Sequence, residues 1–395
     1  MISINKQSFK DRKAIIRVDF NVPMNSDKRV LDSSRIQGAK STILKVLNDG
    51  GTCILISHLG RPNGVERKFS LEPIIPEIEK ILGYKVLFLK DALGKKTEKI
   101  IEELKPGQVV LLENLRFYPE EVAGDELFAK KLSLYGDCYI NDAFGTAHRA
   151  HASTTIIAKF FNKNKFSGHL LSKEVEAIEK VFDSGEKPIL AILGGAKVSS
   201  KITIIESVLN RVDAIIVGGG MAFTFVKALG GEIGDSICEN DKLELALSIL
   251  EKAKKKGVKI YLPSDVVCAQ EFSDIGTTKI EEITKISKGW QGLDAGPKTI
   301  KKFQKAVEMA KTILWNGPIG VFELESFSKG TVKLGEAIAN STSNGAYSLV
   351  GGGDSVAAVK KFNFQDKVSY VSTGGGAMLE SLEGKMLPGI IALSN

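Results

Sequence analysis

The sequence predicts an α/β fold with two domains, each a mostly parallel sheet with helices on both faces, joined by an interdomain helix. Its 395 residues allow about two to four compact units at roughly 100 to 200 residues each. Short apolar, β-branched runs alternate with helical patterns along the chain, which is typical of parallel sheets. These runs fall into two series, and a charged amphipathic segment at 170–182 separates them.

The first series predicts the sheet of an N-terminal domain. Helical patterns lie between most of its runs, at 34–47, at 71–82 and at 96–104; the second has apolar residues at positions 74, 75, 78, 81 and 82. The strands are expected at 14–20, 52–57, 85–89, 109–113 and 138–141.

The second series predicts a separate sheet, because both series together hold too many strands for one comfortable sheet. Its strands are expected at 188–193, 214–217, 259–262, 312–315, 347–350 and 368–371, with helical stretches such as 299–310 between them. The segment 170–182 has apolar residues at 171, 175, 178, 181 and 182, which mark one face of a helix. We expect this helix to pack on one side and to connect the two domains rigidly.

Composition excludes several classes of protein. The balance of 54 Lys and Arg against 47 Asp and Glu is 54 − 47 = +7, with no basic block interleaved with aromatics, so small anionic ligands fit better than nucleic acid. No apolar run reaches the roughly 18 residues of a membrane helix. The N-terminus has no apolar signal segment, so a cytoplasmic location is expected. The four cysteines form no C-x-x-C pair and are expected to be buried, reduced thiols.

Cations and hydrogen-bonding groups follow the strands of the first half. Ligands of open parallel sheets bind beyond the carboxyl ends of the strands, so these residues are expected to meet. Arginine forks from several loops would clamp a carboxylate or a phosphate, whereas His148-x-x-His151 lacks a carboxylate at metal spacing and disfavours zinc. The group comprises Asp19, Asn21, His58, Arg61, Asn114, Arg116, Asp142, His148, Arg149 and His151, with Arg35 near a helix start.

Glycine turns follow the strands of the second half, at 194–195, 218–220, 316–318, 351–353 and 374–376. Glycine lets backbone N–H groups approach a phosphate closely, and a helix N-terminus behind the turn favours negative charge. Lys197 and Lys201, four residues apart, are expected to project from one face of such a helix toward phosphate oxygens. Asp354 has two interpretations: the N-cap of a helix that starts near Ser355, or an oxygen ligand of nucleotide-bound Mg²⁺.

Two standard nucleotide-binding motifs are absent from the sequence. The nearest approach to a Walker motif, from Gly292 to Thr299, is one residue short, and the first strand is not followed by G-x-G-x-x-G. A nicotinamide dehydrogenase is therefore the runner-up interpretation. A non-catalytic nucleotide or RNA binder is a third, and it predicts the loss of Arg35, Lys197 or Asp354, all of which are present.

From end to end the chain closely resembles the phosphoglycerate kinase family. The motifs that carry this resemblance are RVDFNVP, SHLGRP, LLENLRF, NDAFGTAHRAHAS, GGAKVSSK, GGGMAFTF, GLDAGPKT, WNGPIGVFE, GGGDS, STGGGA and LEGKMLPG, and they occur in the family's order. Departures are few: Gln291 stands where the family commonly has Met, and Met378 and Ser381 replace residues that are often small and apolar or aromatic, respectively.

The resemblance implies reversible phosphoryl transfer from 1,3-bisphosphoglycerate to ADP, with Mg²⁺ on the nucleotide, by a monomer of two Rossmann-like domains. It implies a phosphoglycerate-binding domain of residues 1–169 plus 383–395, and a nucleotide-binding domain of residues 170–382 with 170–182 as the hinge. The implied phosphoglycerate contacts are Asp19, Phe20, Asn21, Arg35, His58, Leu59, Gly60, Arg61, Arg116 and Arg149.

The same resemblance assigns the nucleotide contacts and the catalytic groups. Glu323 is implied to contact the ribose, and Asp354 the metal ion. Arg35, Lys197 and the helix start at Gly374 and Gly375 are implied to stabilise the transferring phosphoryl group after the hinge closes. The nucleotide contacts are Gly195, Lys197, Lys201, Gly219, Gly292, Asn316, Pro318, Glu323, Gly352, Gly353, Asp354 and Ser355.

Overall fold

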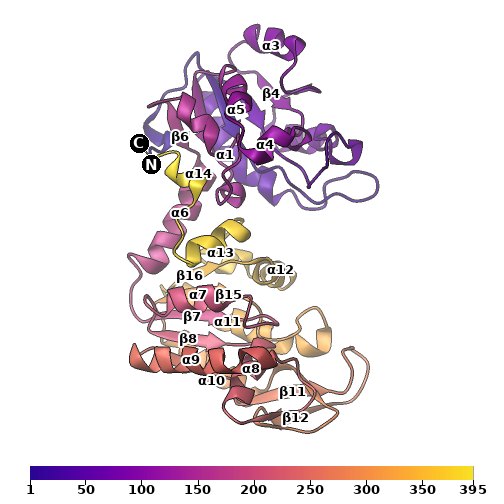
Figure 1. Ribbon diagram of the computed structural model, residues 1–395, viewed down its shortest axis with the longest axis vertical. Coiled ribbons are helices and arrows are strands. Elements are labelled where there is room, and N and C mark those ends of the chain that lie inside the picture. The colour runs from indigo at the N-terminus through magenta and orange to yellow at the C-terminus, as the bar shows by residue number, and fades with distance from the viewer. Residues whose placement is uncertain (395) are drawn as a thin grey trace. The chain divides into compact units, whose positions relative to one another are not determined.

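A computed structural model describes residues 1–394 and confirms the two-domain α/β architecture (Figure 1). The chain divides into two compact units: unit 1 comprises residues 1–175 and 386–395, and unit 2 comprises residues 176–385. The boundaries expected from the sequence were 169 and 383. Unit 2 is therefore inserted into unit 1, and the chain crosses between them twice.

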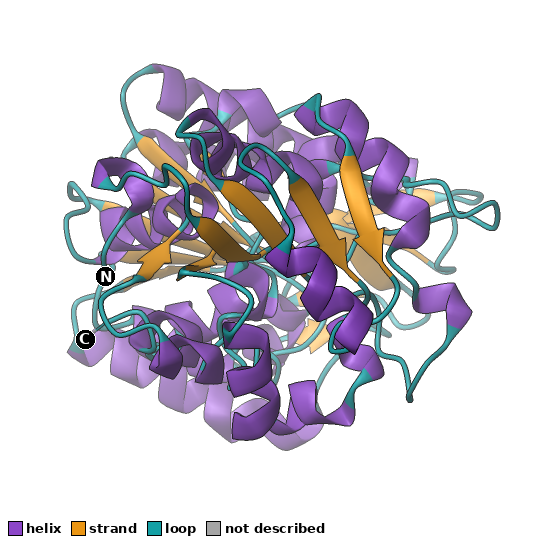
Figure 2. Cartoon of the chain, turned by 90° about the horizontal axis from the view of Figure 1, so that it is seen from above, coloured by secondary structure: helices purple, strands orange, loops and turns teal. Residues whose placement is uncertain are grey.

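Unit 1 is built on a six-stranded, all-parallel sheet with the order β3-β4-β2-β1-β5-β6. Every residue of β2, β4 and β5 is buried, so both faces of the sheet are covered, and Figure 2 shows helices on both sides of the strands. The strands are β1 (Lys13–Arg17), β2 (Thr52–Ile56), β3 (Val86–Leu89), β4 (Val109–Leu112), β5 (Cys138–Asn141) and β6 (Lys165–Ser167).

The longest helix of unit 1 buries an apolar stripe. In α1 (Ser34–Asn48), the buried face includes Ile36, Ile43 and Val46, at the spacing of an amphipathic helix. The others are α2 (Ile75–Leu82), α3 (Lys95–Glu102), α4 (Pro119–Ala123), α5 (Glu126–Ser133) and α14 (Pro388–Ile391). The C-terminal α14 returns to unit 1, where the Gly389 N–H donates to the Ala147 carbonyl at 2.8 Å.

Helix α6 (His169–Phe182) carries the chain from unit 1 into unit 2, and the boundary between the units falls inside it. Its N-terminus is well capped within unit 1. The Leu170 and Leu171 N–H groups donate to Asp142 Oδ1 at 2.8 and 3.2 Å, and the His169 N–H donates to Thr42 Oγ1 at 2.8 Å. Such capping satisfies backbone groups that a helix start otherwise leaves without a partner.

Unit 2 has a second six-stranded parallel sheet, with the order β10-β8-β7-β15-β16-β17. Its strands are β7 (Ile189–Leu193), β8 (Ala214–Val217), β10 (Lys259–Tyr261), β15 (Thr312–Asn316), β16 (Tyr347–Val350) and β17 (Tyr370–Val371). Its helices are α7 (Ile202–Val208), α8 (Met221–Ala228), α9 (Leu243–Lys255), α10 (Pro297–Glu308), α11 (Lys329–Ser343), α12 (Gly353–Lys361) and α13 (Gly376–Leu382).

Two small sheets in unit 2 were not expected from the sequence. One is three-stranded and antiparallel, with β11 (Asp265–Ala269) between β12 (Thr278–Glu282) and β14 (Gln291–Ala295). The other pairs β9 (Glu232–Ile233) with β13 (Lys285–Ile286). The sequence pattern did not indicate these strands, because β12 is rich in charged residues and β14 contains Gly and Asp, which are residue types depleted in strands.

The described chain also contains short 3₁₀ turns, one of which forms the first turn of the helix expected at 71–82. The turns are Ile4–Lys6, Arg67–Phe69, Glu72–Ile74, Leu115–Phe117, Phe144–Thr146, Ile156–Phe160, Asn240–Lys242, Glu325–Phe327 and Gln365–Lys367.

Two further expectations concern membrane spans and cysteines. No helix within residues 1–394 is long and apolar enough to cross a membrane. All four cysteines are free thiols, but Cys238 is half-buried, so the expectation of burial was wrong for it.

Candidate active site

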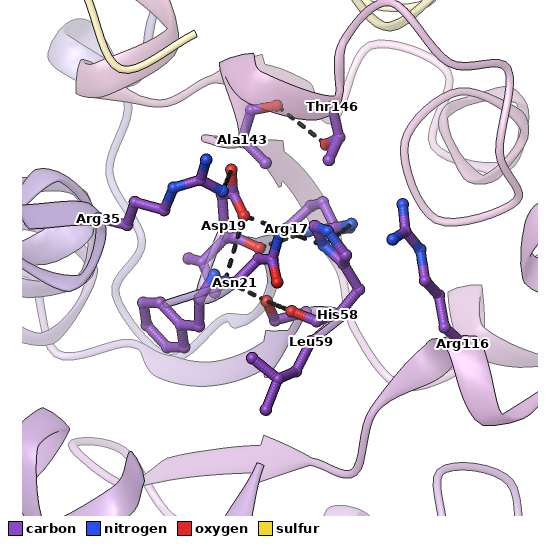
Figure 3. A network of polar contacts seen from close by, with 12 residues as sticks. Arg17, Asp19, Asn21, Arg35, His58, Leu59, Arg116, Ala143 and Thr146 are labelled. Carbon is purple, nitrogen blue, oxygen red and sulfur yellow. Dashed lines mark hydrogen bonds and ion pairs between the residues drawn. The ribbon is translucent and has the colours of Figure 1, made fainter. Parts of the chain in front are cut away.

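Several of the residues expected in the first half gather at one edge of the unit 1 sheet, and Figure 3 shows Arg35, His58 and Arg116 there around Asp19. Strands β1, β2, β4 and β5 are parallel, so the loops after their carboxyl ends meet there. Arg35 reaches the same place from the first turn of α1. The residues are Asp19, Phe20 and Asn21 after β1, His58, Leu59, Gly60 and Arg61 after β2, Arg116 after β4, and Arg149 beyond β5.

Asp19 ties three of these segments together. One of its oxygens accepts a charge-assisted hydrogen bond from Arg35 Nη1 at 2.6 Å. The other accepts the Asn21 N–H at 3.3 Å and lies 4.0 Å from His58 Nδ1. Asn21 Oδ1 in turn accepts the Gly60 N–H at 2.8 Å. The loops after β1 and β2 therefore hold a fixed relation to Arg35.

Arg17, which was not predicted as a site residue, lies beneath this cluster at the end of β1. Its side chain is fully buried, with Nε donating to Ser153 Oγ at 2.8 Å and Nη2 lying 3.2 Å from His58 Nδ1. Burial, and then the charges of Arg17 and Arg116, hold the pKa of His58 well below its usual 6.5. His58 is therefore neutral at physiological pH and can accept a hydrogen bond from Arg17.

Arg116 contributes a second half-buried guanidinium. Its Nη1 donates to the Gly60 carbonyl at 2.6 Å, while its buried Nε has no hydrogen-bond partner among the described residues. Burial, followed by the charges of Arg17 and Arg149, lowers the pKa of Arg116 to about 10, which leaves it protonated at neutral pH. Its donors are therefore available for an anion.

A buried carboxylate balances part of this positive charge. Glu121 is fully buried and accepts the Ser153 hydroxyl at 2.6 Å and the Ser153 N–H at 2.9 Å, which connects it to Arg17 through Ser153. His151 Nδ1 lies 4.0 Å from the same carboxylate. Burial, and then Arg116 and Arg17, lower the pKa of His151 to about 4, so this ring is neutral as well.

Two of the predicted substrate residues lie in the core. Phe20 and Leu59 are buried, and their N–H groups donate to Ser57 Oγ at 2.9 Å and to Asn114 Oδ1 at 3.2 Å, respectively. They shape the loops and do not present their side chains. Arg61 is exposed and Arg149 is half-buried, so these two can present cations from the surrounding loops.

In unit 2 the glycine turns converge at the carboxyl edge of the sheet. A Cβ at Gly194 would lie 2.0 Å from the Pro318 carbonyl oxygen, and a Cβ at Gly219 would lie 2.8 Å from the Gly195 nitrogen. At Gly352, whose φ is +90°, a Cβ would lie 2.7 Å from Asn316 Nδ2. The turns therefore approach one another so closely that only glycine fits.

The expected placement of Lys197 and Lys201 on one helix face is wrong. Helix α7 starts at Ile202, so Lys197 lies in the preceding loop, where it is exposed, and Lys201 is the N-cap residue. The glycines leave residues 194–201 as an irregular loop. Lys201 Nζ contacts Asn316 Oδ1, whose Nδ2 donates to the Gly351 carbonyl at 2.9 Å. Burial lowers the pKa of Lys201.

Asp354 is not an N-cap residue, which corrects one of its two interpretations. Gly352 takes that position, and Asp354 stands in the first turn of α12, where a carboxylate still favours the helix dipole. The next residue, Ser355, accepts the Gly317 N–H at 2.5 Å. At the last glycine turn, Gly375 is the N-cap residue of α13 with a φ of +49°, and the Gly374 N–H donates to Ser372 Oγ at 3.0 Å.

A cavity of about 560 Å³ opens beside these turns. Six of the predicted nucleotide residues line it: Gly195, Gly219, Gly292, Pro318, Glu323 and Asp354. The other predicted nucleotide and catalytic residues of unit 2 are not part of its lining: Lys197, Lys201, Asn316, Gly352, Gly353, Ser355, Gly374 and Gly375. Of these, Lys201 contacts Asn316 at the end of β15, and Asn316 donates to the carbonyl of Gly351, the neighbour of Gly352.

Much of the cavity wall is apolar and was not predicted. It is lined by Phe223 of α8, Val266 and Leu293 of the antiparallel sheet, Phe272 of the loop between β11 and β12, and Leu324 of the loop after β15. Their sequence patterns resemble those of ordinary core residues, so only the tertiary structure reveals the wall. Gln291 also lines the cavity, and Met378 packs where a Cβ of Gly351 would lie, at 1.7 Å from its sulfur.

A metal ion that arrives with a nucleotide fits this site better than a resident ion. Within residues 1–394 there is no group of three or more His, Cys, Asp or Glu side chains that could hold a metal. Asp354 is a single carboxylate on the cavity wall, at a helix start beside the glycine turns. One carboxylate plus substrate phosphates is a common set of Mg²⁺ ligands.

Three features define a two-domain, nucleotide-dependent enzyme with an anionic second substrate. They are the two parallel sheets, the partly buried arginine cluster of unit 1 and the glycine-lined apolar cavity of unit 2. The phosphoglycerate kinase family model matches residues 4–385. The chain belongs to the phosphoglycerate kinase family. It is a kinase of glycolysis and catalyses reversible phosphoryl transfer between 1,3-bisphosphoglycerate and ADP, giving 3-phosphoglycerate and ATP.

Named relatives and solved structures agree with this assignment. The chain is 49% identical to a phosphoglycerate kinase of Porphyromonas gingivalis, covering 99% of this chain and 100% of that protein. It is 48% identical to a cytosolic phosphoglycerate kinase of Arabidopsis thaliana, covering 99% and 97%. The structure of phosphoglycerate kinase from Coxiella burnetii matches with a TM-score of 0.92 at 42% identity, covering 100% of this chain and 98% of that one.

Proposed function

We propose that unit 1 binds phosphoglycerate through the arginine cluster and that unit 2 binds the nucleotide. The observation that carries the first assignment is the partly buried positive charge around Asp19. Arg17, Arg35, Arg116 and Arg149 lie near one another, while His58 and His151 are neutral. Buried cations need anionic partners, and a substrate with a carboxylate and a phosphate supplies them.

Within this cluster, Arg35 is the residue proposed nearest to the reacting carboxyl group. It is the arginine paired with Asp19, and its side chain is 35% exposed, so it can reach a ligand while Asp19 orients it. Arg61, Arg116 and Arg149 are proposed to hold the remote phosphate. Asn21, His58 and the backbone of residues 20, 59 and 60 would shape this binding site through the hydrogen bonds described above.

In unit 2, the apolar cavity is proposed to hold the base, with Glu323 on the ribose. Gly195, Gly219, Gly292 and Pro318 form its close backbone walls. Lys197 and Lys201, with Asn316 and the turn from Gly352 to Ser355, would bind the phosphate groups. Mg²⁺ held by Asp354 and the nucleotide would neutralise phosphate charge.

The chemistry of this chain is then positioning and charge stabilisation. An acyl phosphate transfers its phosphoryl group directly, so no protein nucleophile is needed. Arg35 from unit 1 and Lys197 from unit 2 would stabilise charge on the transferring group, together with the N–H groups of α13 at Gly374 and Gly375. Because the substrates bind to different units, we propose that the units close around α6 and exclude water during transfer.

We further propose a cytoplasmic monomer that requires Mg²⁺. Light scattering of the purified chain near its sequence mass of 42.7 kDa would support the monomer, and a twofold higher mass would contradict it. Activity is tested by ATP-dependent ADP formation with 3-phosphoglycerate, coupled to removal of bisphosphoglycerate, with and without Mg²⁺. Turnover that depends on both is expected. Turnover that persists in excess chelator would contradict the metal requirement.

A further inference from the structure

The loop after β15 carries both Pro318 and Glu323 to the cavity wall, so its conformation matters for nucleotide binding. Glu323 itself is exposed, so burial does not fix the direction of its side chain. Part of the loop is held from the cavity side: the Val321 N–H donates to the Leu293 carbonyl at 2.9 Å. Gly320 also packs on Asp294, since a Cβ there would lie 1.9 Å from Asp294 Oδ1.

Helix α12 holds the same loop at two points. Near its N-terminus, Ser355 Oγ accepts the Gly317 N–H at 2.5 Å. At its last residue, Lys361 Nζ donates to the Phe322 carbonyl at 2.8 Å and to the Glu323 carbonyl at 3.1 Å. One helix thus connects the turn at Asp354 with the backbone of Glu323.

Two phenylalanine rings lie beside the Lys361 ammonium group. Its Nζ lies 5.9 Å from the centroid of the Phe322 ring and 5.5 Å from that of Phe362, and the two rings pack edge to face at 6.4 Å. Phe322 is 5% exposed, so the loop is anchored in the core at this residue. Lys361 itself is exposed, so its side chain is not part of the hydrophobic core.

We propose that Lys361 is a positioning residue for nucleotide recognition. By binding the carbonyls of Phe322 and Glu323, it sets the direction in which the Glu323 carboxylate leaves the loop, and so the fit of that carboxylate to the ribose hydroxyls. The proposal rests on the ribose contact of Glu323 in the proposed function. Lysine suits the role because one ammonium group can donate to two carbonyls while remaining partly hydrated.

The test compares ATP with 2′-deoxy-ATP and 3′-deoxy-ATP in steady-state assays with 3-phosphoglycerate. The variants are Lys361→Met, which keeps length and apolar contact but removes the donors, Lys361→Arg, which keeps them, and Glu323→Ala. Lys301→Met, at an exposed position of α10, is the control for lost charge. We expect Lys361→Met to raise KM for ATP about 3- to 10-fold, the loss of one or two hydrogen bonds, and to reduce discrimination against the deoxynucleotides.

The expected pattern also includes what does not change. KM for 3-phosphoglycerate stays at the wild-type value in Lys361→Met, Lys361→Arg retains the discrimination, and the double variant with Glu323→Ala is no worse than Glu323→Ala alone. If Glu323→Ala loses the discrimination and Lys361→Met keeps it, the positioning role is wrong. If Glu323→Ala itself keeps it, the ribose contact of the proposed function is wrong. A parallel rise of both KM values with a lower Tm would indicate a general structural role and overturn the proposal.

Discussion

Replacement of Arg35 by alanine separates catalysis from folding. Arg35 has one ion pair, to Asp19 at 2.6 Å, and its side chain is 35% exposed, so solvent screening limits the pair to about 1 kcal/mol of stability. Asp19 keeps the Asn21 N–H after the replacement. In a unit of this size, such a loss lowers Tm by about 2–4 °C. Loss of a charged donor at the reacting group costs about 10³-fold in kcat/KM, or about 4 kcal/mol.

The assay measures ADP formation dependent on 3-phosphoglycerate, and thermal unfolding is followed by circular dichroism. Arg29→Ala, which removes an exposed arginine from the same unit, serves as the matched control and should keep both activity and Tm. The reasoning would be refuted if Arg35→Ala kept kcat/KM within tenfold of the wild type. A fall in Tm large enough to unfold the protein at the assay temperature would refute it equally.

Three other perturbations test separate parts of the site. Lys197→Ala should lower kcat about 100-fold in the same assay with Tm within about 2 °C, because Lys197 is exposed; an unchanged kcat would exclude its role. The fold lowers the pKa of His151 from 6.5 to about 4. Between these pH values only the unfolded chain binds the proton on His151. The contribution of the neutral ring to the free energy of unfolding is therefore fully present above pH 6.5 and is lost as the pH falls toward 4. Glutamine cannot take up this proton, so the free energy of unfolding of His151→Gln should rise relative to the wild type by about 1.4 kcal/mol for each pH unit from 6.5 down to 4. Urea titrations across this range measure the difference. A difference between the two proteins that does not change with pH would contradict the neutral ring. Gly194→Ala places a Cβ 2.0 Å from the Pro318 carbonyl oxygen and should lower the free energy of unfolding by about 3 kcal/mol in the same titrations at pH 7. Gly353→Ala is the control, because a Cβ there has nothing within 4 Å, and it should leave the free energy of unfolding unchanged. Equal losses in the two variants would argue against the close packing of the turns.

The large parallel sheets could be predicted from the sequence because their strands are short apolar runs that repeat between helices. Helix α6 also followed from its pattern, since the expected 170–182 became His169–Phe182. The antiparallel sheet could not be predicted in this way. Its β12 strand is TKIEE, with alternating exposure at a sheet edge, and such a strand gives a weak pattern over five residues.

The cationic and glycine-rich parts of the site were predictable because unusual residues follow strands that end at one edge. Two local details were not. Whether Lys197 lies on a helix depends on where α7 begins after the glycine turn at 194–195. The N-cap residue of α12 is Gly352 and not Asp354, because the backbone at that position has a φ of +90°, which glycine readily adopts.

Arg17 shows a different limit of sequence reasoning. It is the last residue of β1, and the pattern alone cannot say that its side chain is buried or that Ser153, far along the chain, is its partner. The apolar wall of the cavity had the same difficulty, because Phe223, Val266 and Leu293 come from three separate elements. The available signal for Arg17 was a charged residue directly after the buried apolar residues Ala14, Ile15 and Ile16.

The central claim is that the two units bind different substrates. Calorimetric titration of the wild type, Arg35→Ala and Lys201→Met with 3-phosphoglycerate and, separately, with ADP and Mg²⁺ tests it most directly. We predict that Arg35→Ala weakens only 3-phosphoglycerate binding and that Lys201→Met weakens only ADP binding, each by about tenfold or more. If either variant weakened both ligands equally while keeping its Tm, the assignment of one substrate to each unit would be contradicted.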